Sequence, residues 1–124
     1  NEVKLDQPFS VNEELIIPID ALHGSLQVFG YRIQDVVYLT DVKTIETSEI
    51  EKIKDCKILI INCLREEPHN THFNLEEVLH FISLIRPKTT YLTHISHFFG
   101  FHQEIQKKLP ANVFVAYDNL EINI

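Results

Sequence analysis

Apolar and polar residues follow each other in patterns that predict both strands and helices. Residues 57–62 (KILIIN) form an almost continuous apolar run, which is typical of a strand buried on both faces. Runs rich in β-branched and aromatic residues predict further strands at 14–19, 26–33, 36–40, 89–92, 112–116 and 120–124. Pro18 favours an edge or an end of its strand. We expect a tight turn between 26–33 and 36–40, and a closing pair of strands around Asp118-Asn119.

Helical spacing is clearest after Asn74, which can cap a helix together with Glu77 in a capping box. Apolar residues then recur on one face of the helix: Leu75, Val78, Leu79, Ile82 and Ile85. This stripe is typical of core packing. Arg86-Pro87 should end the helix, because the residue before a proline avoids the helical region.

Two shorter helices are expected on either side. Ser48 and Glu51 form a second possible capping box, which predicts a helix over about 49–55. A third helix is expected over about 101–109, where Pro110 stops it. Helices that alternate with strands indicate an α/β sheet with parallel crossovers, in which ligands collect at the carboxyl ends of the strands.

Composition limits the partners of the chain. Its 124 residues are 44% apolar and 23% charged, as expected for one globular domain. The net charge of −7 makes nucleic acid an unlikely partner without excluding it. No apolar run reaches the roughly 18–20 residues that span a bilayer, so we expect no membrane segment. The chain lacks methionine and opens with Asn1, which we interpret as a processed or truncated piece.

Cys56 and Cys63 flank the strand at 57–62. At about 3.3 Å per residue their Cα atoms would be roughly 20 Å apart, whereas a disulfide needs less than about 7 Å. We therefore expect two thiols in the core and a reducing, cytoplasmic setting.

Histidine and aspartate residues occur where several predicted strands end. Asp41 follows VVYLT, His94 follows the strand at 89–92, and His23 precedes the strand that pairs with VVYLT. Further histidines occur in the neighbouring loops: His69, His72 and His97. Imidazole and carboxylate groups are ligands of zinc, manganese and iron. Each residue alone is more often a turn or cap residue, and His80 and His102 fit a surface or packing role.

Six segments resemble, in order, the C-terminal half of a metallo-β-lactamase-fold hydrolase. The resemblance is greatest to the branch that contains the cyclic phosphodiesterase of phosphonate breakdown. The matching segments are LHG at 22–24, GYRI at 30–33, YLTD at 38–41, THFNLEEVL at 71–79, YLTHISH at 91–97 and YDNLEI at 117–122.

The resemblance implies an αββα sandwich, of which residues 1–124 would be a single partial domain with a mixed sheet and flanking helices. It implies two divalent metal ions, zinc or manganese, which activate a bridging water to cleave a phosphodiester or related ester. His23 and His94 correspond to metal ligands, and Asp41 corresponds to the carboxylate that bridges both metals. His72 corresponds to a proposed general acid, and His97 corresponds to the second histidine of LTHISH, beside the metal ligands.

The family also requires an HxHxDH motif, and this chain has none. We therefore expect the parent protein to be the enzyme and the piece alone to be inactive or very weak. Phe98-Phe99-Gly100 replaces residues that are often polar in relatives. A lone half would expose an apolar sheet face, which predicts self-association. The same fold serves thioesters, lactams and tRNA 3′ ends, and a non-catalytic interaction or regulatory domain is the alternative from another class.

Overall fold

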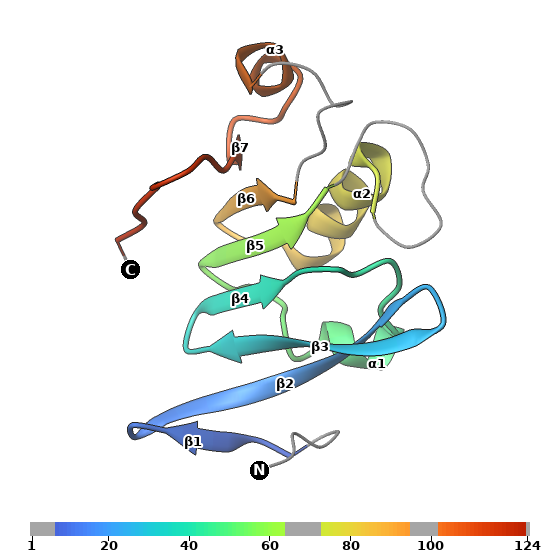
Figure 1. Cartoon of the computed structure of the whole chain (residues 1–124), viewed down its shortest axis with the longest axis vertical. Coiled ribbons are helices and arrows are strands. Elements are labelled where there is room, and N and C mark those ends of the chain that lie inside the picture. Colours follow the sequence, from blue (N-terminus) through green and yellow to red (C-terminus); the bar gives the residue numbers. More distant parts are fainter. Residues whose placement is uncertain (1–6, 64–72, 95–101, 124) are drawn as a thin grey trace.

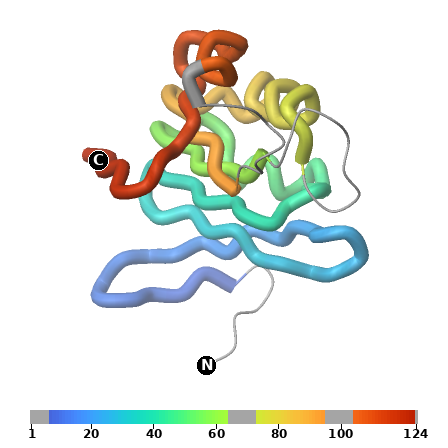
Figure 2. The backbone as a smooth tube through the Cα atoms, turned by 45° about the horizontal axis from the view of Figure 1, so that its top comes forward, coloured from blue at the N-terminus to red at the C-terminus, as the bar shows by residue number. Residues whose placement is uncertain are grey.

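A single mixed sheet organises the chain. The computed structural model describes residues 7–63, 73–94 and 102–123, and within them seven strands follow one another across the sheet in chain order, from β1 to β7. Their bounds are Phe9–Val11 (β1), Glu14–His23 (β2), Leu26–Ile33 (β3), Val36–Leu39 (β4), Ile58–Asn62 (β5), Thr89–Thr93 (β6) and Val113–Val115 (β7). The first four strands pair antiparallel, and β4 to β7 pair parallel. Figures 1 and 2 show this order, with β1 at one edge and β7 at the other.

Each parallel connection carries a helix, as such crossovers usually do. The helices are Thr47–Ile50 (α1), Leu75–Ile85 (α2) and His102–Lys107 (α3). Asn74 caps α2 in the predicted capping box, because its side chain accepts from the Glu77 N–H (2.8 Å) and Glu77 accepts from the Asn74 N–H (3.2 Å). Arg86 ends the helix in a left-handed conformation before Pro87. The predicted α/β class with parallel crossovers is confirmed.

The core lies between one face of the sheet and the helices. Alternate residues of β4, β5 and β6 point into it, and Val37, Leu39, Leu59, Ile61 and Leu92 are fully buried. Helix α2 contributes Val78, Phe81 and Ile85 to the core, and Leu75 and Ile82 pack against it. This confirms four residues of the predicted apolar stripe, to which the structure adds Phe81. Both cysteines are buried and no disulfide joins them, as predicted. Within the described residues, no helix is long and apolar enough to cross a membrane.

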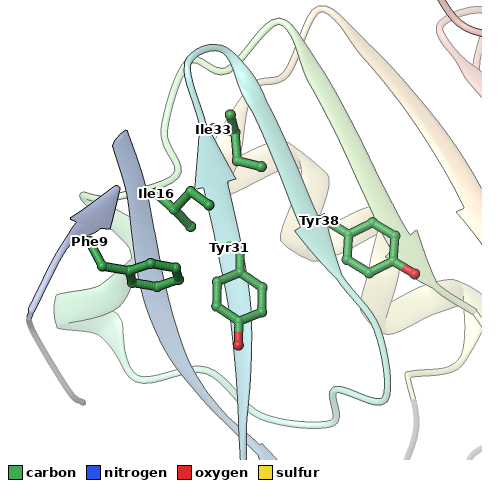
Figure 3. A pocket seen from close by; sticks show the side chains of 5 residues that line it. All are labelled: Phe9, Ile16, Tyr31, Ile33 and Tyr38. Carbon is green, nitrogen blue, oxygen red and sulfur yellow. The ribbon is translucent and has the colours of Figure 1, made fainter. Parts of the chain in front are cut away.

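The opposite face of the sheet is also apolar. Ile16, Tyr31, Ile33 and Tyr38 project from β2, β3 and β4, and Phe9 of β1 joins them around a hollow of about 260 Å³ (Figure 3). Tyr38 is 48% exposed and Ile33 is 41% exposed. No helix of the described residues covers this face in Figure 1. The sequence predicts self-association through such a face, and that statement stays a prediction.

Two of the predicted elements are wrong, and one strand was not predicted. Helix α1 begins after Glu46 rather than at Ser48, without any side-chain cap, and only turns follow it up to Asp55. The predicted capping box does not form, because Ser48 lies inside the helix rather than before it and the Glu51 carboxylate pairs with Lys54 (3.0 Å). The buried Glu49 carboxylate accepts the N–H of Asp20 (3.0 Å) and pairs with Lys52 (2.8 Å). These contacts with β2 decide how the segment folds.

The predicted strand at 120–124 is absent from residues 120–123. The Leu120 N–H donates to the Tyr117 carbonyl (3.1 Å) in a turn that contains Asn119 at φ 67°, and the chain then leaves the sheet edge (Figure 1). Strand β1 was not predicted, because its hairpin turn, Asn12-Glu13 with φ 48° and 71°, lacks the glycine that usually marks such turns. Strand β2 extends to His23, four residues beyond its predicted end.

Candidate metal site

Two of the predicted ligands meet at the carboxyl edge of the parallel strands. Strands β4 and β6 lie on either side of β5 and end in register, since Leu39 pairs with Ile61 and Ile61 pairs with Leu92. Asp41 and His94 therefore emerge at the same edge. His94 Nε2 lies 3.4 Å from Asp41 Oδ1, and the two side chains are 45% and 50% exposed. The pair is close enough to act together and open enough to meet a ligand from solvent.

Both residues hold unusual backbone conformations. Asp41 has φ 57° and His94 has φ 59°, in the left-handed region that side chains other than glycine rarely adopt. This conformation turns the chain sharply at the end of each strand. Six other described residues besides glycine also have positive φ, so this conformation shapes the two strand ends without by itself marking a functional site.

His23 reaches the same edge through backbone pairing. It is the last residue of β2, and its neighbour Leu22 exchanges hydrogen bonds with the segment that follows Asp41. The Leu22 N–H donates to the Thr44 carbonyl (2.9 Å), and the Lys43 N–H donates to the Leu22 carbonyl (2.8 Å). Nδ1 of His23 is buried. In the described ranges 7–63, 73–94 and 102–123, however, no three His, Cys, Asp or Glu side chains gather as a metal-binding group.

The other histidines of the prediction are not placed. His69, His72 and His97, as well as Phe98-Phe99-Gly100, lie outside the described residues. The general-acid role of His72 and any role of His97 stay predictions. His80 is exposed on α2, as expected for a surface residue.

The Asp41–His94 pair fits a divalent cation. Nitrogen and oxygen ligands at about 2.0–2.1 Å from one tetrahedral zinc ion are about 3.3–3.4 Å apart. The observed Nε2–Oδ1 distance of 3.4 Å matches this separation. Imidazole and carboxylate ligands suit zinc and are also compatible with manganese. The two residues could thus share one ion without moving apart.

The segment after Asp41 is anchored to α2. Lys43 Nζ forms an ion pair with Glu77 Oε1 (2.7 Å), and the Phe73 N–H donates to the Val42 carbonyl (3.2 Å). The Asn62 side chain forms two more hydrogen bonds with Val42. Asn62 was not among the predicted site residues, although it is the polar residue that ends the apolar run at 57–62.

A polar hollow of about 360 Å³ adjoins His94. Thr93, His94, Ala116, Tyr117 and Asp118 line it, so it opens at the ends of β6 and β7. Asp118 was predicted only as a turn residue. Its carboxylate and the Tyr117 ring provide a polar and an aromatic wall next to the candidate ligands.

Comparison with known proteins agrees with this architecture. Residues 1–95 match the family model described as the beta-lactamase superfamily domain. The chain belongs to this superfamily, and its fold is the metallo-β-lactamase fold. The resemblance that the six sequence segments indicated is therefore confirmed.

Particular relatives add detail. A diphosphatase of the PhnP family is 32% identical, with a TM-score of 0.92 over 96% of this chain and 47% of that chain. A metallo-beta-lactamase fold protein, YhfI, from Bacillus subtilis is 23% identical, with a TM-score of 0.73 over 92% of this chain and 51% of that chain, and shows the fold alone. An octanoyltransferase of Porphyromonas gingivalis is 39% identical over 97% of this chain, but the match covers 25% of that protein. The chain thus spans about half of the diphosphatase and a quarter of the octanoyltransferase.

Proposed function

We propose that this chain supplies half of the two-metal site of a metal-dependent hydrolase that cleaves a phosphodiester or a related phosphoanhydride. The observation that carries the proposal is the 3.4 Å contact between His94 Nε2 and Asp41 Oδ1 at the carboxyl edge of the parallel strands. Membership of the superfamily and the similarity to a diphosphatase of the PhnP family support the reaction class.

In this proposal, Asp41, His94 and His23 would hold the ions, zinc or manganese, and Asp41 would contribute to both. When bound, such cations supply Lewis acidity toward phosphoryl oxygens and activate water near neutral pH. The remaining ligands come from an HxHxDH-type segment outside these 124 residues. Without that segment, we expect the chain alone to be inactive or very weak.

The chain's own residues would orient the substrate. The hollow beside His94 can receive one side of the ester, where Tyr117 offers a ring face and Asp118 accepts hydrogen bonds from hydroxyl or amino groups. His72 is proposed to donate a proton to the leaving oxygen, which makes that oxygen a better leaving group. Variants of His72 should therefore lose more activity on poor leaving groups than on nitrophenolate.

The test uses the natural full-length protein. Metal content is measured by mass spectrometry, and hydrolysis is followed with bis-nitrophenyl phosphate, a cyclic phosphate ester and a diphosphate ester. We expect about two equivalents of zinc or manganese, and we expect Asp41→Ala to abolish hydrolysis. Asp35→Ala is the matched control, because Asp35 precedes the same strand, β4, at its other end and is exposed.

A different outcome would favour the non-catalytic alternative. If the full-length protein binds no metal and hydrolyses none of the three substrates, the chain is better explained as an interaction or regulatory domain. His23, Asp41 and His94 would then lie at the edge of the sheet without binding metal. Metal binding without hydrolysis of the phosphate esters would instead keep the site and refute the substrate class.

A further inference from the structure

Asn62 is a buried polar residue between the two strands that carry Asp41 and His94. It ends β5, the strand between β4 and β6, and its side chain is fully buried. The four residues before it in the strand are apolar. A buried amide is costly unless its donor and its acceptor are both satisfied, so its partners show what the residue does.

Both partners belong to Val42, the residue after Asp41. The Val42 N–H donates to Asn62 Oδ1 (3.0 Å), and Asn62 Nδ2 donates to the Val42 carbonyl (3.0 Å). The backbone ladder between β4 and β5 has already ended at Leu39 and Ile61. Val42 lies three residues beyond Leu39, and the amide of Asn62 takes the place of a strand neighbour for it there.

Asn62 contacts the segments that carry both candidate ligands, one through its side chain and the other through its backbone. It fixes the Val42 peptide, and Asp41 directly before it holds its left-handed turn at φ 57°. On the other side, Asn62 pairs with Thr93 in the sheet, and His94 follows Thr93 at once. The Cys63 N–H also donates to the Thr93 carbonyl (3.0 Å). The end of β5 thus sets the separation between the carboxylate and the imidazole.

We propose that Asn62 is a positioning residue, which acts through Val42 to hold the Asp41 carboxylate in place for the metal ions. The proposal rests on the proposed function above. It depends on the chemistry of a planar amide, which offers one acceptor and one donor to the two polar groups of a single peptide residue. Leucine has a similar size but offers neither group, and serine is too short to reach both.

The chain offers a matched control at Gln106. Its side-chain amide forms the same kind of clamp on β7, because Gln106 Nε2 donates to the Val113 carbonyl (2.9 Å) and the Val115 N–H donates to Gln106 Oε1 (3.0 Å). Gln106→Leu removes two comparable hydrogen bonds without touching Val42. It separates a general loss of stability from an effect on the metal site.

The experiment measures cobalt binding to the natural full-length protein and to Asn62→Leu, Asn62→Ser and Gln106→Leu. Affinity is determined by competition with a chelator, and the visible spectrum of bound Co²⁺ reports ligand geometry. We expect both Asn62 variants to bind Co²⁺ about 10–100-fold more weakly, the usual effect of losing a group that orients a ligand, and to change the spectrum. Gln106→Leu should keep the wild-type affinity and spectrum.

The outcomes separate the two proposals. If either folded Asn62 variant binds Co²⁺ with the wild-type affinity and spectrum, the positioning role is overturned and the proposed function stands. A wild-type protein that binds no Co²⁺ overturns both. Should Asn62→Leu not fold, Asn62→Ser decides, because its smaller side chain fits within the space of asparagine. An equal loss of affinity in Gln106→Leu would also overturn the specific role of Asn62.

Discussion

His94 holds a left-handed backbone at the end of β6, with φ 59°, and this conformation makes a prediction about stability. At such a position glycine should be more stable than alanine, because alanine keeps the Cβ atom that disfavours positive φ. The variants His94→Gly and His94→Ala both remove the imidazole and its contact with Asp41. The difference between them therefore reports the backbone alone.

The magnitude follows from two opposing terms. An L-residue in the left-handed region costs about 1–2 kcal/mol. Glycine avoids this cost. It also makes the unfolded chain more flexible, which lowers the free energy of unfolding by about 0.4–1 kcal/mol. We therefore expect His94→Gly to exceed His94→Ala in free energy of unfolding by about 1 kcal/mol, or about 3–5 °C in Tm for a chain of this size.

His80 provides the control with the opposite sign. It is an exposed histidine in the middle of helix α2, where glycine is less favourable than alanine by about 0.8–1 kcal/mol. All four variants are unfolded with urea in the presence of a chelator, so that metal binding does not contribute. If His94→Gly is less stable than His94→Ala, as expected for the pair at His80, the assigned backbone conformation is wrong. If the order is as predicted, the left-handed conformation of His94 is supported independently of its side chain.

Three further predictions test the fold. Gly30→Ala should destabilise the chain by about 1–3 kcal/mol in urea unfolding. A Cβ atom at this position would overlap the Leu39 side chain and lie 2.9 Å from the Tyr38 carbonyl oxygen. Unchanged stability would contradict the close approach of β3 and β4. Burial raises the pKa of the Cys56 thiol to about 11, so the thiol stays protonated at pH 8. Iodoacetamide should therefore label Cys56 only after unfolding. Rapid labelling of the native protein would refute the burial of Cys56. The 124-residue chain should self-associate at micromolar concentration in sedimentation, and Tyr38→Glu on the exposed apolar face should weaken that association; a clean wild-type monomer would rule it out.

Sequence patterns were sufficient where local chemistry and tertiary packing agree. The capping box of Asn74 and Glu77 is satisfied within one helical turn, so it could be predicted from spacing alone. The buried strand at 57–62 was equally clear from its apolar content. Ser48 and Glu51 have the same spacing as a capping box, yet Ser48 lies inside the helix, where the buried Glu49 binds the Asp20 N–H of β2. A local pattern cannot indicate this contact, because Asp20 lies 29 residues before Glu49 in the sequence.

The candidate site shows the same division. Asp41 and His94 were predictable because parallel strands in one sheet end at the same edge, and the structure brings them into contact. The path of His23 depends on the pairing of Leu22 with Thr44, which spacing does not indicate. Asn62 was missed because a single asparagine after an apolar run looks like the end of a strand. Its role becomes visible only when its amide is seen to bind the residue beside Asp41.

The most direct test is the position of the metal itself. Crystals of the natural full-length protein, grown with manganese or zinc, would locate the ions by anomalous scattering at the absorption edge. We predict two ions, with Asp41 coordinating both and with His94 Nε2 and His23 bound at about 2.0–2.2 Å. Ions bound elsewhere, or a carboxyl edge without anomalous density while Asp41 and His94 remain in contact, would contradict the account.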